Sequence, residues 1–181
     1  AAVKAVDPGA KVTGPVSWGW VGYLYSSLDH GDDNFGTHAD RTRHGGDPFL
    51  LWFLKQVREH DTRAGKRTLD VLDVHFYPQA LGVYAGPERS SPKTNALRLR
   101  STRSLWEPTY RDESWIATPV QLLPRLRQWV EENYPGIQGI GYAVVFRPEE
   151  KDAIVKRIRA EGVSEFAIRP DEPRDFYTAI I

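Results

Sequence analysis

The sequence predicts an α/β fold: a segment of a TIM-like (β/α) barrel with about four strand–helix units, at most half of a closed barrel. Predicted helices and strands alternate along the 181 residues, which is typical of a parallel sheet covered by helices. The loops after the first two strands are long and the helix-to-strand connections are short, as in barrels whose long loops share one face. An open doubly wound sheet is the alternative, but no glycine-rich phosphate-binding pattern follows a strand.

Each predicted element has a local signal. Asp47 and Pro48 predict an N-cap and a first helical residue, and Gly65 predicts the end of that helix. Thr118 and Gln121 form a capping-box pattern at the start of another helix. The predicted helices cover residues 1–6, 48–63, 118–134 and 148–161, the predicted strands cover 11–16, 139–146, 163–168 and the apolar part of 70–79, and two long loops cover 21–46 and 78–117.

Composition limits the possible partners. The 24 basic and 24 acidic residues cancel, so no net positive field favours nucleic acid or an anionic membrane. The absence of cysteine excludes disulfides and thiol chemistry. No apolar run approaches the roughly 18 residues that a membrane span needs. We therefore expect neither a nucleic-acid nor a membrane partner. The start resembles the last turns of a helix and lacks Met, so we expect the natural chain to extend upstream.

Polar and aromatic side chains follow the first two predicted strands. His75, Tyr77 and Gln79 follow the apolar start of the central strand, and Trp18 and Trp20 directly follow the first strand. Because the carboxyl ends of barrel strands carry functional residues, these side chains are candidates for binding a ligand, with the indoles stacking on sugar rings. The alternative is structural: the tryptophans close the core, and His75 and Tyr77 find partners inside it.

The second long loop combines arginines, tryptophans and carboxylates. Trp106 and Trp115 are further candidates for sugar stacking, and Glu113 and Asp73 are the candidate catalytic carboxylates. A glycosidase needs two carboxyl groups about 5–9 Å apart. Ion pairing with nearby arginines is the favoured interpretation for each of the loop carboxylates. The carboxylates concerned are Glu107, Asp112 and Glu113, and the arginines are Arg98, Arg100 and Arg103.

The first long loop holds acidic residues and histidines that could bind a hard cation such as calcium. The calcium candidates are Asp29, Asp32 and Asp33. Their spacing matches no EF-hand template, so a solvated acidic loop is the favoured interpretation, and no metal or other cofactor is expected.

Several motifs together resemble glycoside hydrolase family 44 over about residues 1–136. They are the segments Gly14–Trp20, His44–Gly46, Leu72–Gln79 and Leu97–Ile116, together with the run from Pro124 to Gly136. The resemblance implies a TIM-like barrel with an added β-sandwich. It also implies secretion and retaining hydrolysis by two glutamates, with endo-β-1,4-glucanase, xyloglucanase, xylanase or mannanase activity on β-glycans.

The chain departs from this family at the catalytic positions. The family's acid/base glutamate lies upstream of the first residue, and its nucleophile would fall near Ala143, where residues 139–146 contain no carboxylate. Residues 137–181 do not resemble the family, and only faintly resemble the C-terminal βαβ unit of aminoimidazole ribonucleotide synthetases. We therefore predict a partial barrel over residues 1–136 and a divergent βαβ tail over 137–181.

The predicted function follows from these departures. We expect the chain to bind β-1,4-glucans such as cellulose, xyloglucan or xylan, with weak or no hydrolysis. One alternative is a non-catalytic carbohydrate-binding module. The other is a partial barrel without function of its own, whose open strand edges would favour a homodimer that closes the barrel.

Overall fold

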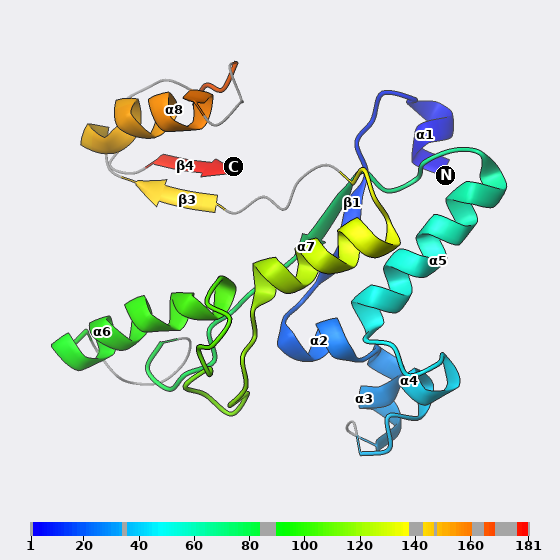
Figure 1. The fold of residues 1–181 in the computed structure, drawn as a ribbon, viewed down its shortest axis with the longest axis horizontal. Coiled ribbons are helices and arrows are strands. Elements are labelled where there is room, and N and C mark those ends of the chain that lie inside the picture. The colour runs from blue at the N-terminus through cyan, green and yellow to red at the C-terminus, as the bar shows by residue number, and fades with distance from the viewer. Residues whose placement is uncertain are drawn as a thin grey trace. The chain divides into compact units, whose positions relative to one another are not determined.

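A computed structural model describes residues 2–33, 36–83, 90–137, 143–146, 148–160, 165–168 and 177–180. The chain divides into two compact units, Ala1–Gly139 and Ile140–Ile181 (Figure 1). The first unit contains α1 Ala2–Val6, β1 Thr13–Ser17, α2 Trp20–Leu24, α3 Ser27–Asp33, α4 Ala39–Arg43, α5 Phe49–Ala64, β2 Val71–Val74, α6 Pro92–Ser101, the 3-10 helix η1 Thr102–Leu105 and α7 Leu122–Asn133. The second contains β3 Ala143–Phe146, the 3-10 helix η2 Pro148–Glu150, α8 Lys151–Ala160 and β4 Tyr177–Ile180.

The first unit is built on one parallel strand pair. β1 and β2 run parallel with Thr13 opposite Val71 and Ser17 opposite Val74. The register shifts at Val16, whose φ of 60° lies in the left-handed region that a β-branched residue rarely adopts. The shift lets both strands end at the same level, so the residues that follow them lie side by side. The predicted parallel pairing is confirmed for these two strands.

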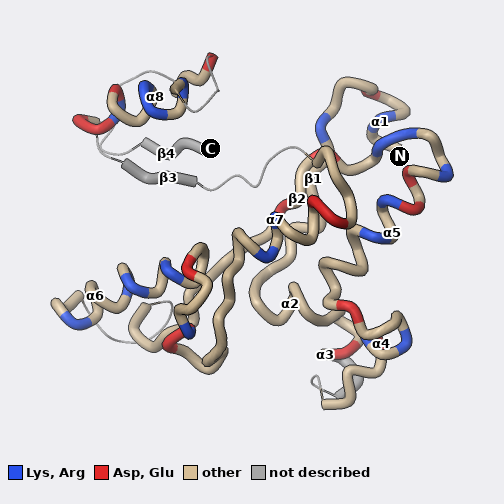
Figure 2. The backbone as a smooth tube through the Cα atoms, in the orientation of Figure 1, with Lys and Arg blue, Asp and Glu red and all other residues tan. Residues whose placement is uncertain are grey.

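Helix α5 packs against α7 and against α2, and α5 and α7 contribute several residues of the core. Leu50 and Leu54 of α5 are fully buried, together with Val120 and Leu126 at the start of α7. The charged residues of α5 begin at Lys55 and include both signs (Figure 2), and except for the buried Asp61 they lie at exposed positions of the helix. The amphipathic helix predicted for residues 48–63 is therefore confirmed.

The ends of α5 agree only partly with the prediction. Gly65 closes the helix in the left-handed conformation at φ 60°, as predicted. At the other end Pro48 takes the N-cap position, so the helix begins at Phe49 and Asp47 does not cap it. The Asp47 carboxylate instead accepts a hydrogen bond from Lys55 at 2.7 Å.

The start predicted for α7 is wrong. The helix begins at Leu122, after Gln121 in a left-handed conformation, and Thr118 does not cap it. Pro124 explains the difference. A start at Thr118 would place this proline in the helix interior, where it removes a backbone donor, whereas a start at Leu122 places it in the first turn.

Both predicted long loops contain helices. Residues 21–46 hold three helices of 5 to 7 residues, α2, α3 and α4, which are too short to give a clear periodic pattern. The loop predicted at 78–117 contains α6 and η1. The start of α6 does carry a signal, because Ser91 accepts a hydrogen bond from the Thr94 amide at 3.1 Å and Pro92 follows it.

The second unit does not extend the parallel sheet. β3 pairs antiparallel with β4, with Ala143 opposite Ile180, and the described residues 165–168 of the predicted fourth strand form no strand. The described strands therefore form two separate two-stranded sheets, and the single parallel sheet that we predicted is wrong. Apolar runs identify strands but not the direction in which they pair.

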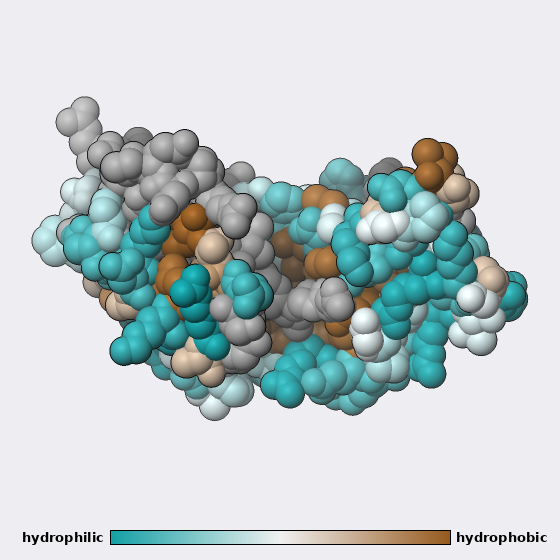
Figure 3. Space-filling model, turned by 90° about the horizontal axis from the view of Figure 1, so that it is seen from above, coloured by the Kyte–Doolittle hydropathy of each residue, from teal (hydrophilic) through white to brown (hydrophobic). Residues whose placement is uncertain are grey.

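The surface view in Figure 3 shows hydrophilic side chains with smaller apolar patches among them. Among the described residues, no helix combines the length and the apolar character required to cross a membrane.

A buried ion pair joins α1 to the start of β2. Lys4 Nζ lies 2.7 Å from Asp70 Oδ2, and both residues are more than nine-tenths buried. The same carboxylate oxygen accepts a hydrogen bond from the Val12 amide at 2.8 Å. The hydrogen bonds from Lys4 and Val12 hold the pKa of Asp70 below its usual value.

We predict that Asp70→Asn lowers the free energy of unfolding by about 3 kcal/mol, because it leaves the Lys4 ammonium buried without its counter-charge. Urea denaturation followed by tryptophan fluorescence would measure this, since all six tryptophans lie in the first unit. Lys11→Met is the matched control: Lys11 is 65% exposed and 4.0 Å from Asp70, so we expect a change within about 0.5 kcal/mol. Equal losses in the two variants would contradict the argument.

A second carboxylate joins the end of α5 to the end of α7. Asp61 accepts hydrogen bonds from the Thr68 amide at 2.8 Å, from the Thr68 hydroxyl at 2.6 Å and from the Tyr134 hydroxyl. Burial alone would raise the pKa of Asp61, but these hydrogen bonds outweigh it and lower the pKa to about 2. Burial and the Asp61 charge raise the pKa of Tyr134 to about 12.

The lowered pKa makes stability depend on pH. Because the folded pKa is about 2 and the ordinary value is 3.8, the contribution of Asp61 is complete above about pH 4 and is lost as the pH falls toward 2. We predict that Asp61→Asn removes roughly 1–2 kcal/mol of this acid dependence, measured by urea denaturation from pH 5 to pH 2. Glu59→Gln, on the exposed side of α5, should retain the wild-type dependence. If the free energy of unfolding of Asp61→Asn fell with pH as steeply as that of the wild type, Asp61 would contribute nothing to the acid dependence.

Candidate functional site

Backbone and buried hydrogen bonds fix the residues that follow β1 and β2. The His75 amide donates to the Ser17 carbonyl at 2.8 Å, and the Tyr23 hydroxyl donates to the His75 carbonyl. Tyr23 is fully buried, and its burial raises the pKa of the phenol, which therefore remains a hydrogen-bond donor. The two strand ends are thus tied to each other and to α2.

His75 and Tyr77 form a flat aromatic surface beyond this tie. Their rings are stacked with centroids 5.7 Å apart and planes 8° from parallel. The Tyr77 hydroxyl lies 3.1 Å from His75 Nδ1, and the Gln79 amide donates to the Tyr77 carbonyl at 2.8 Å. Both residues are exposed, so part of this aromatic surface is accessible from solvent.

Trp18 and Trp20 have different environments. Trp18 is 63% exposed and follows β1 immediately. A Cβ atom at Gly22 would lie 2.9 Å from its Nε1, so the indole packs closely on a position that requires glycine. Trp20 is half-buried, with its ring edge-to-face with Tyr23 at 6.2 Å and beneath the Arg125 guanidinium at 5.6 Å. Trp18 is therefore available for stacking, whereas Trp20 contributes to packing.

Glu113 is engaged in a network of three side chains. Arg100 donates to both carboxylate oxygens at 2.9 Å, and the Tyr110 hydroxyl donates to Oε1 at 2.8 Å. The hydrogen bonds from Arg100 and Tyr110 lower the pKa of Glu113 to about 2. A carboxylate that is always ionised and bound in this way cannot donate a proton near neutral pH, so Glu113 is not poised as a general acid.

The other candidate carboxylates also have structural partners. Glu107 pairs with Arg103 at 3.8 Å, so the predicted ion pairs are confirmed for Glu113 and Glu107. The ion-pair prediction for Asp112 is wrong, because its oxygens accept hydrogen bonds from the hydroxyls of Ser104 and Ser114. Asp73 lies within β2, opposite Pro15, where the Thr13 hydroxyl approaches its Oδ2 at 3.4 Å.

Trp106 and Trp115 are exposed, at 53% and 62%, in the segment between α6 and α7. Among the described residues, no hydrogen bond or ring contact joins either of them to the residues at the strand ends. That Trp106 and Trp115 share one binding surface with the strand-end residues therefore stays a prediction.

The calcium candidate Asp29 has a structural role. It is 1% exposed, and its two oxygens accept hydrogen bonds from the amides of Asp40 at 2.8 Å and Arg41 at 3.2 Å. It thereby caps the start of α4, where the preceding His38 makes no side-chain cap. This burial contradicts the expected solvated loop at Asp29. No group of three or more potential metal ligands occurs among the described residues, and the side chains of Asp32 and Asp33 lie outside them.

Sequence reasoning missed the residues that hold the site together. Tyr23 and Arg125 lie behind the strand ends, in α2 and α7. The run Trp20–Tyr25 offered a weak signal, because aromatic residues three positions apart share one helix face. Nothing in the local sequence predicts that Arg125 covers Trp20, since the contact spans more than a hundred residues.

The N-terminal part of the chain is similar to known proteins. The family model of glycoside hydrolase family 44 matches residues 1–80. Endoglucanase A of Paenibacillus lautus is 38% identical over 144 residues, which cover 75% of this chain and 19% of that protein. The N-terminal region of this chain is glycoside hydrolase family 44-like.

Solved structures agree with this assignment. CelM2, a bifunctional glucanase-xylanase from a metagenome library, matches with a TM-score of 0.66 and 44% identity over 74% of this chain and 26% of that chain. A family 44 xyloglucanase of Paenibacillus polymyxa, solved with xyloglucan, matches with a TM-score of 0.58 and 36% identity over 76% of this chain and 27% of that one. The chain thus spans about a fifth to a quarter of the length of these relatives.

The end of the chain matches a different model. The CHASE domain model covers residues 126–181, from within α7 through the second unit. The two family models therefore match separate parts of the chain.

The environments of Trp18 and Trp20 lead to opposite predictions for their alanine variants. We predict that Trp18→Ala weakens glycan binding about tenfold but changes the free energy of unfolding by no more than about 0.5 kcal/mol, because its indole is exposed. Trp20→Ala should instead cost about 2 kcal/mol of stability through lost packing on Tyr23 and Arg125. Titration calorimetry with a xyloglucan oligosaccharide and urea denaturation separate the two effects. A destabilised Trp18→Ala would count against the proposed division of roles.

Proposed function

We propose that the family 44-like region binds a β-1,4-glucan chain along the strand-end surface, defined as Trp18, His75, Tyr77 and Gln79, and does not cleave it. The observation that carries this proposal is the hydrogen bond between the His75 amide and the Ser17 carbonyl, which holds the two groups of aromatic side chains at one level. The resemblance to enzymes that act on glucans and xyloglucan supports the choice of ligand.

The chemistry of this surface suits a pyranose. A sugar ring has apolar C–H faces that pack on the planes of indole and phenol rings, and hydroxyl groups around its edge that need partners. His75 Nδ1 is within hydrogen-bond reach of Tyr77, so Nε2 is the ring nitrogen that can bond to a ligand hydroxyl. Xyloglucan is the first ligand to test, followed by xylan and glucomannan.

Hydrolysis requires a pair of carboxyl groups, and the candidates among the described residues are engaged elsewhere. A retaining glycosidase needs a nucleophile and an acid about 5–5.5 Å apart. Glu113 is bound by Arg100 and Tyr110, and Asp73 lies within β2 rather than at its end. The family resemblance would place the nucleophile near Ala143, and residues 139–146 contain no carboxylate. We infer binding without turnover.

The proposal also includes a homodimer in which two copies of the partial barrel pair along their strand edges. A two-stranded parallel pair has two open edges, and pairing with a second copy would cover them. Light scattering of the purified chain would reveal such a homodimer. A folded chain that binds no glycan would favour the competing view of a partial barrel without its own function. An extracellular location remains a prediction from the family resemblance.

We predict that the wild-type chain and Glu113→Gln bind a xyloglucan oligosaccharide with affinities within about twofold of each other, because Glu113 serves a structural network. Neither should release reducing ends from xyloglucan during prolonged incubation. Calorimetry and a reducing-sugar assay give the two readouts. Reducing ends that disappear in Glu113→Gln would assign the chemistry to Glu113 and overturn the proposal of binding without turnover.

A further inference from the structure

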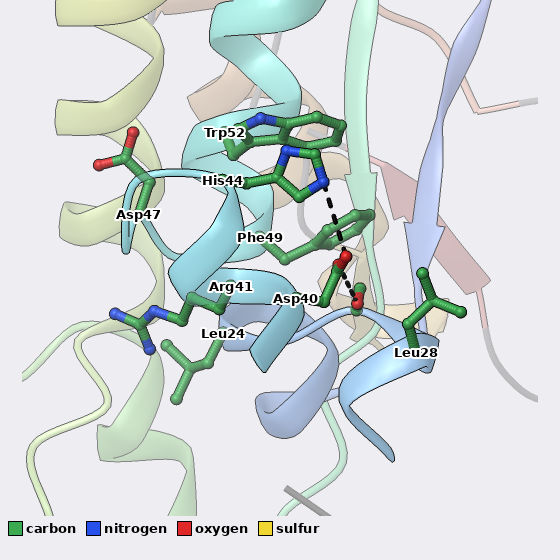
Figure 4. A pocket seen from close by; sticks show the side chains of 9 residues that line it. Leu24, Leu28, Asp40, Arg41, His44, Asp47, Phe49 and Trp52 are labelled. Atoms are coloured by element: carbon green, nitrogen blue, oxygen red, sulfur yellow. Dashed lines mark hydrogen bonds and ion pairs between the residues drawn. The ribbon is translucent and has the colours of Figure 1, made fainter. Parts of the chain in front are cut away.

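A pocket of about 200 Å³ lies apart from the strand-end surface, between α3, α4 and the first turn of α5 (Figure 4). Leu24, Leu28, Phe49 and Trp52 form its apolar lining, and Asp40 and His44 are among its polar groups. Drug-sized ligands occupy pockets of roughly 300–1,000 Å³, so this pocket suits a single ring.

Aromatic rings form one wall of this pocket. The His44 ring lies over Trp52 with centroids 4.9 Å apart, and Phe49 stacks beside Trp52 at 6.2 Å (Figure 4). Trp52 is half-buried, so part of its indole faces the cavity. Such a wall offers an apolar plane to a flat or ring-shaped ligand.

The Asp40 carboxylate has one oxygen, Oδ1, that receives no short hydrogen bond from the described residues. Its residue is only 9% exposed, and its Oδ2 accepts a short hydrogen bond of 2.6 Å from Ser26. Its Oδ1 has only longer contacts among the described residues, 3.5 Å to His44 Nε2 and 4.0 Å to Arg43. The neighbouring Asp29, by contrast, receives a backbone amide on each oxygen. Oδ1 can therefore accept a hydrogen bond from a ligand.

The other charged groups of the lining are already engaged. Arg41 donates to the Gly46 carbonyl at 2.8 Å and lies over the Tyr25 ring, and Asp47 binds Lys55 at 2.7 Å. The Asp40 carboxylate disfavours an anion. A metal ion is disfavoured too, because no group of three potential ligands occurs in the described part of the chain. A neutral ligand with an apolar face and hydroxyl donors fits what remains.

We propose that this pocket binds one pyranose ring, which packs on the aromatic wall of His44, Phe49 and Trp52 and donates a ring hydroxyl to Asp40 Oδ1. The ring is either a free monosaccharide or one unit of a longer glycan. In the second case the inference rests on the proposed function, since both sites would then serve the same polysaccharide.

The test uses the full chain and methyl β-D-glucopyranoside as the probe. In ¹H–¹⁵N spectra, the indole signal of Trp52, identified by its absence in Trp52→Phe, should shift saturably with the sugar. Asp40→Asn should weaken this binding about tenfold, because it removes the charged acceptor while keeping an oxygen for Ser26. Glu59→Gln, a carboxylate-to-amide change on α5 outside the pocket, should bind as the wild type does.

A second variant, Leu28→Phe, tests the pocket independently in case Asp40→Asn does not fold. Leu28 is 57% exposed at the pocket, so Leu28→Phe should narrow the entrance and abolish the Trp52 shift without altering Asp40. Trp18→Ala should leave the monosaccharide response unchanged, because Trp18 does not line this pocket.

A xyloglucan oligosaccharide distinguishes the two sources of the ring. A Trp52 shift with both ligands supports a subsite for a glycan unit, and a shift with the monosaccharide alone supports a free-sugar site even if the strand-end surface binds nothing. Suppose that neither ligand shifts the Trp52 signal while the oligosaccharide still binds in a manner that depends on Trp18. This result would overturn the proposed sugar binding in the pocket and leave the proposed function intact.

Discussion

The parallel pairing of β1 with β2 is the constraint on which the candidate site depends. A two-stranded sheet has little of its own to prevent slippage, and a slip of one residue would turn His75 and Trp18 to other faces. The His75–Ser17 and Tyr23–His75 hydrogen bonds fix the strand ends, and the hydrogen bonds between Val12 and Asp70 fix the strand starts. Because both ends are fixed, a surface made from two distant segments can keep one geometry.

Several acidic residues hold this architecture together. Asp29 caps α4, Asp61 joins the ends of α5 and α7, Asp70 anchors α1, and Glu113 orders the segment after α6. Their oxygens are consequently occupied, which separates them from Asp40, whose Oδ1 keeps unused capacity.

The sequence predicted those features that depend on local pattern. The amphipathic stripe of α5 and its closing Gly65 were predictable, as were the polar residues after the apolar strand that begins at Asp70. The antiparallel partner of β3 was not, because pairing direction leaves no trace in hydropathy. The different environments of Trp18 and Trp20 also required the structure. The two indoles are chemically alike, and only the distant Arg125 and the buried Tyr23 distinguish them.

Binding and catalysis place different demands on a barrel. A sugar-binding surface can be assembled from two adjacent strand ends, because stacking needs only exposed rings held at one level. Retaining hydrolysis needs two carboxylates at a set separation, each in its own protonation state. A region that spans about a quarter of its relatives' length can keep the first arrangement without the second. In this chain the indole of Trp18 is exposed, whereas Glu113 is engaged by Arg100 and Tyr110, and the proposal of binding without turnover rests on this contrast.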